Sequence, residues 1–264
     1  MQSVAIFGIT GRMGQALIQA LRETRSLRLS GAIASAASRR LGVDAAAEGA
    51  PTGVCITADG GQGLRGAAVA LDFSVGDGVA AHAELCAAAG VPLLVGATGY
   101  DAASRRSLEQ AAAHIAVLIA PNTSVGVSVA ARLVSMAAAS LGSGYDVEIF
   151  DAHHRTKRDA PSGTALALGA AAAGARGQSL QDVAVYDAAY GREPRPAGSI
   201  GFSSLRAGDI VGEHTVTFAG AGERIEITHR ATDRLTFARG ALRAAEWLPG
   251  RPAGLYGMEH VLGL

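Results

Sequence analysis

The sequence predicts an α/β protein, with a parallel sheet in the first half and a smaller α+β region with a mixed or antiparallel sheet in the second. Up to about residue 123, short apolar runs alternate with helix-like stretches, which is typical of parallel strands joined by helical crossovers. Three segments between residues 199 and 229 alternate apolar and polar side chains instead. The 264 residues, 49% hydrophobic and 17% charged, suffice for one large or two modest globular domains and exclude a disordered chain.

The expected elements of the first half follow in βα order. Short apolar runs, of the kind buried on both faces of a parallel sheet, predict strands at residues 4–7, 27–34, 68–73, 92–95 and 116–120. The stretches between them predict helices at residues 13–22, 79–89 and 102–113. The segment 34–66 is less regular and is expected to be a loop with at most one helix.

After about residue 123 the sequence pattern changes from short apolar runs to longer helical stretches and alternating strands. We expect helices at 124–141 and 162–175, a strand at 147–150, and alternating strands at 199–205, 210–218 and 224–229. Hairpin-like turns are expected at 207–209 and 220–222, where glycine separates alternating segments. A last helix at 237–247 would return to the first region. The predicted domains are therefore 1–123 with 234–264, and 124–233.

A glycine-rich turn after the first strand predicts a dinucleotide-binding site. Gly8, Gly11 and Gly14 have the spacing G-x-x-G-x-x-G, which differs by one glycine from the usual fingerprint and precedes a helical stretch. Gly8 would allow a tight turn, Gly11 the approach of a pyrophosphate, and Gly14 close helix packing. Arg12 and Met13 lie at the helix N-terminus, where free amides would hold phosphates. The first region is thus a candidate Rossmann-like domain, although a turn that binds nothing remains the alternative.

The end of the second predicted strand favours NADPH over NADH. An acidic residue would be expected there to bind the ribose hydroxyls of NAD, but residues 31–35 contain no carboxylate. Arg39 and Arg40 follow, and Arg39 is the candidate partner of a 2′-phosphate. A solvated surface pair of arginines is the alternative.

The highest density of potentially reactive and charged side chains in the sequence lies at residues 151–165. His153 and His154 are adjacent there, and three cations follow: Arg155, Lys157 and Arg158. The whole chain has 23 basic and 23 acidic residues, so this is a local anion site in a protein without a global attraction to nucleic acid or an anionic membrane. A loop of ordinary solvated charges is the alternative.

A helix start follows these charges. Pro161 and Ser162 precede an alanine-rich run, so the amides of Gly163 and Thr164 could hold a carboxylate. No metal site is predicted, because adjacent histidines diverge and no cysteine or third histidine lies at ligand spacing.

Composition also bears on the cellular setting. Cys55 and Cys86 are too few for a disulfide framework and are expected to be packing residues. No signal-like segment is seen and no run approaches 18 uninterrupted apolar residues, so we expect a cytoplasmic protein that does not span a membrane.

Together these motifs resemble the 4-hydroxy-tetrahydrodipicolinate reductase (dihydrodipicolinate reductase) family, from the first strand to the last helix. The resemblance is carried by residues 8–14, 72–74, 96–99, 120–124, 153–165 and 206–214. It implies NAD(P)H-dependent reduction of a cyclic dicarboxylate in diaminopimelate and lysine biosynthesis. It also implies that the second domain binds substrate and assembles four chains into a homotetramer.

The resemblance further implies roles for individual residues. His153 would be the catalytic acid/base and Lys157 the proton donor, His154 would contact the substrate, and the Gly163 and Thr164 amides would hold one carboxylate. The nicotinamide side would be lined by Gly96, Thr98, Ala120 and Asn122. This chain departs from the family at Val75, where a basic residue is frequent near the adenosine, and at Thr123, where an aromatic is frequent.

Two other interpretations stay open at this point. One is a related dehydrogenase that acts on an amino-acid-derived substrate, such as an aspartate or homoserine dehydrogenase, which should lack the 153–164 loop. The other is a cofactor-sensing protein that has kept the fold and lost turnover. The polar segments 206–214 and 226–230 are expected to be structural, because alternation alone accounts for them.

Overall fold

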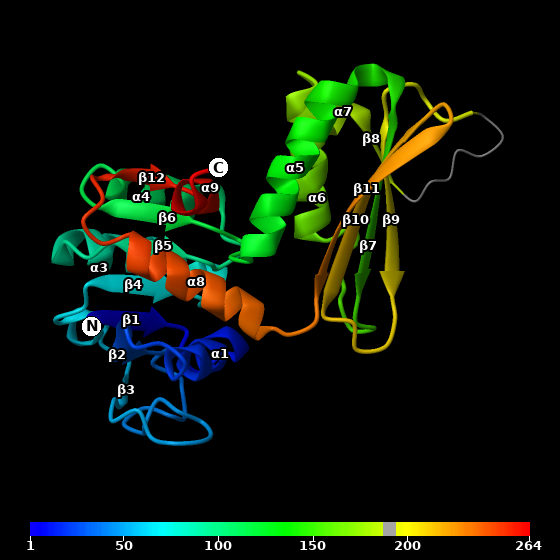
Figure 1. Cartoon of the computed structure of the whole chain (residues 1–264). Coiled ribbons are helices and arrows are strands. Elements are labelled where there is room, and N and C mark those ends of the chain that lie inside the picture. The colour runs from blue at the N-terminus through cyan, green and yellow to red at the C-terminus, as the bar shows by residue number, and fades with distance from the viewer. Residues whose placement is uncertain (187–193) are drawn as a thin grey trace. The chain divides into compact units, whose positions relative to one another are not determined.

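The computed structural model describes residues 1–186 and 194–264, and the chain divides into two units (Figure 1). The first unit comprises Met1–Val125 and Leu235–Leu264, and the second comprises Gly126–Arg234. Each unit has its own sheet and its own buried core.

The first unit is built on a seven-stranded parallel sheet with the order β12-β6-β5-β4-β1-β2-β3. Its strands are β1 (Gln2–Phe7), β2 (Leu27–Ile33), β3 (Ile56–Thr57), β4 (Val69–Asp72), β5 (Leu93–Val95), β6 (Ala116–Ile119) and β12 (Gly254–Tyr256). The first six have the doubly wound strand order 3-2-1-4-5-6, which reverses direction between β1 and β4. The predicted Rossmann-like fold class is confirmed.

Both faces of this sheet are covered, as continuous apolar strands require. Val4 and Ile6 of β1 belong to a core that includes residues of α1 and α8, whereas Ala5 and Phe7 belong to a second core with α3 and α4. The helices of this unit are α1 (Arg12–Leu21), α2 (Gly60–Leu64), α3 (Val79–Ala89), α4 (Ala102–Ala111), α8 (Leu235–Trp247) and α9 (Met258–Leu262), with a 3₁₀ turn η1 (Gly76–Gly78).

The second unit holds a five-stranded mixed sheet with the order β11-β10-β7-β9-β8. Its strands are β7 (Asp146–His153), β8 (Ala184–Tyr186), β9 (Ile200–Arg206), β10 (Gly212–Gly220) and β11 (Glu223–Ala231). Its helices are α5 (Val125–Leu141), α6 (Gly163–Ala175) and α7 (Leu180–Val183), with a 3₁₀ turn η2 (Gly142–Gly144). The core packs Ile149 and Phe218 of the sheet with Val134 of α5 and Leu168 of α6.

One predicted connection is wrong. The turn at 207–209 does not form a hairpin, because β7 lies between β9 and β10, pairing parallel with β9 and antiparallel with β10. The turn at 220–222 does join a hairpin, since β10 and β11 pair from Gly212–Ala231 to Gly220–Glu223. Alternation indicates a strand and its faces, but it does not say which strand lies beside it.

The irregular segment 34–66 contains one helix, α2, which agrees with the expected loop with at most one helix. Several short elements were not predicted: β3 in the same segment, and β8, α7, β12 and α9, which lie where no element was expected. Each has five residues or fewer, too short for a periodic signal.

The two cysteines differ in burial. Cys86 is buried as expected, whereas Cys55 is exposed, so its assignment as a packing residue is wrong.

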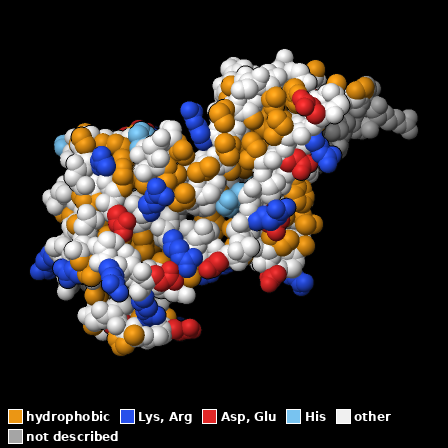
Figure 2. All heavy atoms as spheres, viewed as in Figure 1, with side chains coloured by type: hydrophobic (Ala, Val, Ile, Leu, Met, Phe, Trp, Pro, Cys, Tyr) orange, Lys and Arg blue, Asp and Glu red, His pale blue; other side chains and the backbone are white. Residues whose placement is uncertain are grey.

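One stretch of the described chain, Val125–Gly144, is long and apolar enough to cross a membrane, although Arg132 interrupts its apolar run. Only 22% of its most apolar window is buried. Its inward side chains recur at helical spacing, and Ala130, Val134 and Ala138 join the core of the second unit. Figure 2 shows hydrophobic side chains gathered over α5, whose exposed face carries Val129, Leu133 and Met136. A helix that covers a sheet meets the same criterion, so this is weak evidence for a membrane.

Candidate functional site

The glycine turn has the geometry that a phosphate-binding turn needs. Gly8 has φ +75°, and a Cβ there would lie 2.6 Å from the carbonyl oxygen of Phe73. At Gly14 a Cβ would lie 2.4 Å from the carbonyl oxygen of Ile9, so only glycine lets α1 start this close to the turn. Gly11 is the N-cap of α1 and provides no side-chain cap.

The first turn of α1 leaves its amides available. Within the described residues, the amides of Arg12, Met13 and Gly14 donate to no backbone or side-chain acceptor. Such amides at a helix N-terminus attract anions. Arg12 is exposed beside them, while the partly buried Met13 packs against the core.

A cavity of about 660 Å³ opens next to this turn, within the first unit. Its walls include Gly8, Thr10, Gly11, Phe73, Ser74 and His82. These residues follow β1 and β4, so the cavity lies where the strand order reverses, at the carboxyl edge of the sheet. The glycine turn, its free amides and this cavity together fit a dinucleotide.

His82, which was not predicted, and Asp72, from the motif at residues 72–74, support one wall of this cavity. His82 Nδ1 lies 2.8 Å from Oδ2 of Asp72, which is fully buried, and its ring stacks on Phe7 at 4.0 Å. Asp72 also accepts the amide of Ser74 at 2.9 Å. The pair holds the loop after β4 in place.

The remaining predicted cofactor residues lie at the same sheet edge but outside the walls of this cavity. Gly96 follows β5, and a Cβ there would lie 2.1 Å from the ring of Phe73, so its immediate role is close packing. Thr98 is exposed, Ala120 is buried after β6, and Asn122 accepts the amide of Ser124.

The two arginines after β2 differ. Arg40 donates to the carbonyls of Asp44 and Ala45 and so braces its own loop. Arg39 is exposed, does not line the cavity, and has no polar partner among residues 1–186 and 194–264.

The second unit brings the histidine–lysine loop next to a buried acid. Asp151 lies on β7 two residues before His153, and its side chain is 1% exposed. It accepts the amide of Ser162 at 2.9 Å and pairs with Arg206 at 3.1 Å. Burial alone would raise the pKa of Asp151, but contacts from His153, Ser204, Arg206 and Ser162 outweigh it and hold the pKa well below its usual range.

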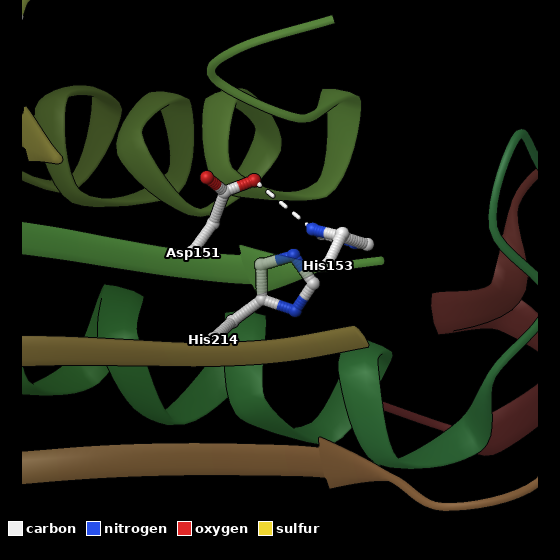
Figure 3. Close-up of side chains that lie close together, drawn as sticks. All are labelled: Asp151, His153 and His214. Atoms are coloured by element: carbon white, nitrogen blue, oxygen red, sulfur yellow. Dashed lines mark ion pairs between the residues drawn. The ribbon is translucent and has the colours of Figure 1, made fainter. Parts of the chain in front are cut away.

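Two histidine rings meet beside this carboxylate (Figure 3). Nδ1 of His153 lies 3.3 Å from Oδ2 of Asp151, and the ring meets that of His214 edge-on at 5.2 Å. His214 is 4% exposed and shares a hydrogen bond of 3.0 Å with the hydroxyl of Ser162. Burial, and then the charge of His153, lowers the pKa of His214 to about 4, so it is neutral at pH 7.

Lys157 and His154 are held on the loop that follows. The ammonium of Lys157 contacts both carboxylate oxygens of Asp159, at 2.7 and 2.8 Å. Burial would raise the pKa of Asp159, but the neighbouring ammonium lowers it. His154 shares a hydrogen bond of 2.8 Å with Thr156. Arg206 donates to the carbonyl of Asp159 at 2.6 Å and ties this loop to the sheet.

The helix start predicted from sequence begins α6. Ser162 is its N-cap, and its hydroxyl accepts the amide of Ala165 at 3.2 Å. Gly163 and Thr164 form the first turn, with Gly163 exposed and Thr164 partly exposed. The N-terminus of α6 therefore lies directly beside the Asp151 cluster.

Asp151, His153 and His214 bring donor atoms within 4.8 Å of one another, which is metal-ligand spacing. His214 is the third group that its distance along the chain hid, because it lies on β10 and not near His153 in the sequence. The donor set nevertheless fits a cation poorly, since the guanidinium of Arg206 and the amide of Ser162 already occupy the carboxylate oxygens of Asp151.

Sequence reasoning therefore found the loop but not its support. Arg206 and His214 lay in a segment expected to be structural, whereas Asp151 and Asp159 lay in the 151–165 segment itself but were given no role. The available signal was weak: the predicted strand ended at residue 150, so the two-residue spacing that places Asp151 and His153 on one face of β7 was not used.

Comparison with known proteins agrees with this arrangement. The family description "Dihydrodipicolinate reductase, N-terminus" matches residues 2–123, and "Dihydrodipicolinate reductase, C-terminus" matches residues 126–262. The 4-hydroxy-tetrahydrodipicolinate reductase of Anaeromyxobacter dehalogenans is 49% identical over 266 residues, covering 100% of this chain and 98% of the relative. That of Herminiimonas arsenicoxydans is 47% identical over 262 residues, covering 99% and 98%.

A solved structure shares the fold over nearly its whole length. The dipicolinate-bound dihydrodipicolinate reductase of Paenisporosarcina sp. TG-14 superposes with a TM-score of 0.78 at 23% identity, covering 98% of this chain and 99% of that one. Both halves of the family description match in order, and the curated relatives match end to end. The chain belongs to the dihydrodipicolinate reductase family.

Proposed function

We propose that this chain reduces 4-hydroxy-tetrahydrodipicolinate, by way of dihydrodipicolinate, to tetrahydrodipicolinate with NAD(P)H, in diaminopimelate and lysine biosynthesis. The observation that carries the proposal is the cluster of His153, Lys157 and the first turn of α6, which joins two proton-bearing groups to an anion-binding helix start. A dicarboxylate needs at least two anion contacts, and this loop and helix provide them.

A nicotinamide cofactor held at the glycine turn would supply a hydride for C4 of the unsaturated ring. The chain's own residues bind the carboxylates of the substrate and transfer protons. The amides of Gly163 and Thr164 hold one carboxylate, and His154 contacts the substrate. Lys157 donates the proton that quenches the negative charge left by hydride addition. Asp159 takes two of the three N–H groups of that ammonium and leaves one for the substrate. His153 acts as acid/base during turnover.

The proposal is tested with freshly prepared substrate by loss of NADPH absorbance at 340 nm. Lys157→Ala should lower kcat by about 10²–10⁴-fold, the usual contribution of a positioned proton donor, and change the Kd for NADPH little. Arg132→Ala is the control, because Arg132 is an exposed cation of the same unit that lies on α5, outside the 151–165 loop. Equal losses of kcat and of NADPH affinity in Lys157→Ala would make Lys157 a structural residue.

The same assay separates the two alternatives. NADPH binding without turnover would favour a cofactor sensor. The related-dehydrogenase alternative is disfavoured because the family description covers residues 126–262, including the His153–Thr164 loop. A structural likeness to the amine dehydrogenase of Mycobacterium smegmatis, with a TM-score of 0.67 at 12% identity, concerns the fold alone.

We propose that the cofactor is held by Gly8, Gly11, Arg12, Met13 and Gly14, and that NADPH is preferred over NADH. The observation behind the preference is the absence of a carboxylate at residues 31–35, with Arg39 exposed and uncommitted on the loop that follows. Arg39→Ala should raise KM for NADPH and leave KM for NADH nearly unchanged, with Arg25→Ala as a surface control. A tenfold higher kcat/KM with NADH than with NADPH would end this proposal.

Gly96, Thr98, Ala120 and Asn122 are proposed to line the nicotinamide side. They follow β5 and β6 at the carboxyl edge of the parallel sheet, where ligands of this fold bind. Thr98→Val should raise KM for the cofactor without lowering thermal stability, because Thr98 is exposed.

We also propose that the second unit assembles four chains into a cytoplasmic homotetramer. Phe150 and Leu205 are large apolar side chains on the same face of its sheet, and each is about two-fifths exposed. Light scattering coupled to gel filtration tests the tetramer: Leu205→Lys should lower the measured mass, and a wild-type mass of about one chain would refute it.

A further inference from the structure

Asp151 is a buried acid that the proposed chemistry does not use. It lies on β7 with the same facing as His153, because side chains two apart on a strand share a face. Its pairing with Arg206 and the amide of Ser162 leaves it anionic, since these contacts favour the charged form over the protonated one.

The two nitrogens of His153 have different surroundings. Nδ1 is buried and has no hydrogen bond among the described residues, and Oδ2 of Asp151 approaches it at 3.3 Å. At the other edge of the ring, a Cβ on Gly212 would lie 3.2 Å from Nε2, so glycine leaves that nitrogen uncrowded. Catalytic hydrogen bonds are commonly long in a ligand-free enzyme and tighten when substrate binds.

We propose that Asp151 is the positioning residue of His153: its carboxylate accepts a hydrogen bond from Nδ1–H, fixes that tautomer, and leaves Nε2 as the nitrogen that exchanges protons with substrate. This inference rests on the proposed function for its catalytic consequence, but the tautomer is a property of the chain itself. A neutral imidazole has one donor and one acceptor nitrogen, and a permanent anion beside one of them selects that one as the donor.

Arg206 stabilises the negative charge of Asp151. It pairs with Asp151 at 3.1 Å and is 17% exposed. Its charge offsets that of the carboxylate, so the buried acid is stable without taking a proton from His153. His214 lies against His153 as a neutral ring and adds no charge near neutral pH.

The first test needs no variant. In protein labelled with ¹⁵N-histidine, long-range proton–nitrogen spectra report which ring nitrogen carries the proton, and the signal of His153 is assigned by its loss in His153→Gln. We expect the neutral form of His153 to carry its proton on Nδ1. A proton on Nε2 in the wild-type protein overturns the proposal.

The second test removes the charge. In Asp151→Asn we expect the tautomer of His153 to shift toward Nε2–H. We expect kcat to fall by about 10²–10⁴-fold while KM changes by less than about threefold, as when the orienting carboxylate of a catalytic histidine is lost. Ser162→Ala is the matched control, because it removes a cap and the bond to His214 from the same cluster but keeps the backbone amide on Asp151. It should retain the Nδ1–H tautomer.

The outcomes are distinct. An unchanged tautomer in a folded Asp151→Asn protein overturns the proposal, as does a shift of His153 to Nε2–H in Ser162→Ala, which keeps the carboxylate. If Asp151→Asn does not fold, the wild-type tautomer decides. If the chain shows no reductase activity, the proposed function fails while the spectra still decide whether Asp151 sets the tautomer of His153.

Discussion

The burial of His214 makes the stability of this protein sensitive to acid well above the range in which carboxylates titrate. His214 is 4% exposed, and its pKa is lowered from 6.5 to about 4 by burial and by the neighbouring charge of His153. Because the folded-state pKa is the lower one, the unfolded chain binds the proton first as pH falls. Stability is therefore full above pH 6.5, declines between pH 6.5 and 4, and changes no further below that.

The size of this effect follows from the shift. A difference of about 2.5 in pKa corresponds to a limiting loss of about 3 kcal/mol, and about 2 kcal/mol of it should be lost between pH 7.5 and pH 5. His229 is also partly buried with a lowered pKa, so the wild-type slope alone does not isolate His214. The matched variant is His214→Gln, which keeps a polar group near Ser162 but does not titrate.

Urea denaturation at pH 7.5 and pH 5 measures the effect. We expect the wild-type protein to lose about 2 kcal/mol more unfolding free energy across this interval than His214→Gln does. Equal losses in the two proteins would show that His214 is solvated or protonated in the folded state. In that case the account of the cluster around Asp151 would be wrong.

Three further changes test other parts of the fold. Gly8→Ala should cost about 1–3 kcal/mol and weaken NADPH binding in calorimetry, because Gly8 has φ +75° and its Cβ would meet the Phe73 carbonyl; unchanged affinity would count against the glycine turn as the phosphate site. Asp44→Asn should speed amide hydrogen exchange at residues 46–53, since the carboxylate accepts amides there at 2.8–3.1 Å, and slow exchange in the variant would contradict this. Phe218→Ala should cost about 3–5 kcal/mol of unfolding free energy because Phe218 is fully buried, and a cost under about 1 kcal/mol would refute the packing of the second unit.

Local patterns predicted what depends on neighbours in the sequence. Continuous apolar runs identified β1, β4, β5 and β6, and the glycine spacing after β1 identified the turn that carries free amides. The start of α6 at Ser162 was readable because a capping hydroxyl acts on an amide three residues away. Strand neighbours in the second unit were not readable, since β7 inserts between β9 and β10 from far earlier in the chain.

By itself, the sequence determined the βα alternation, the phosphate-type turn and the placement of His153 and Lys157 in one short segment, because period, turn chemistry and capping act over a few residues. Only the tertiary structure decided what surrounds that segment, and it extends β7 to His153. Arg206 and His214 reach Asp151 because β9 and β10 flank β7 on both sides. A buried charge is stabilised by groups that the fold delivers from other strands, and their distance along the chain leaves no local pattern to read.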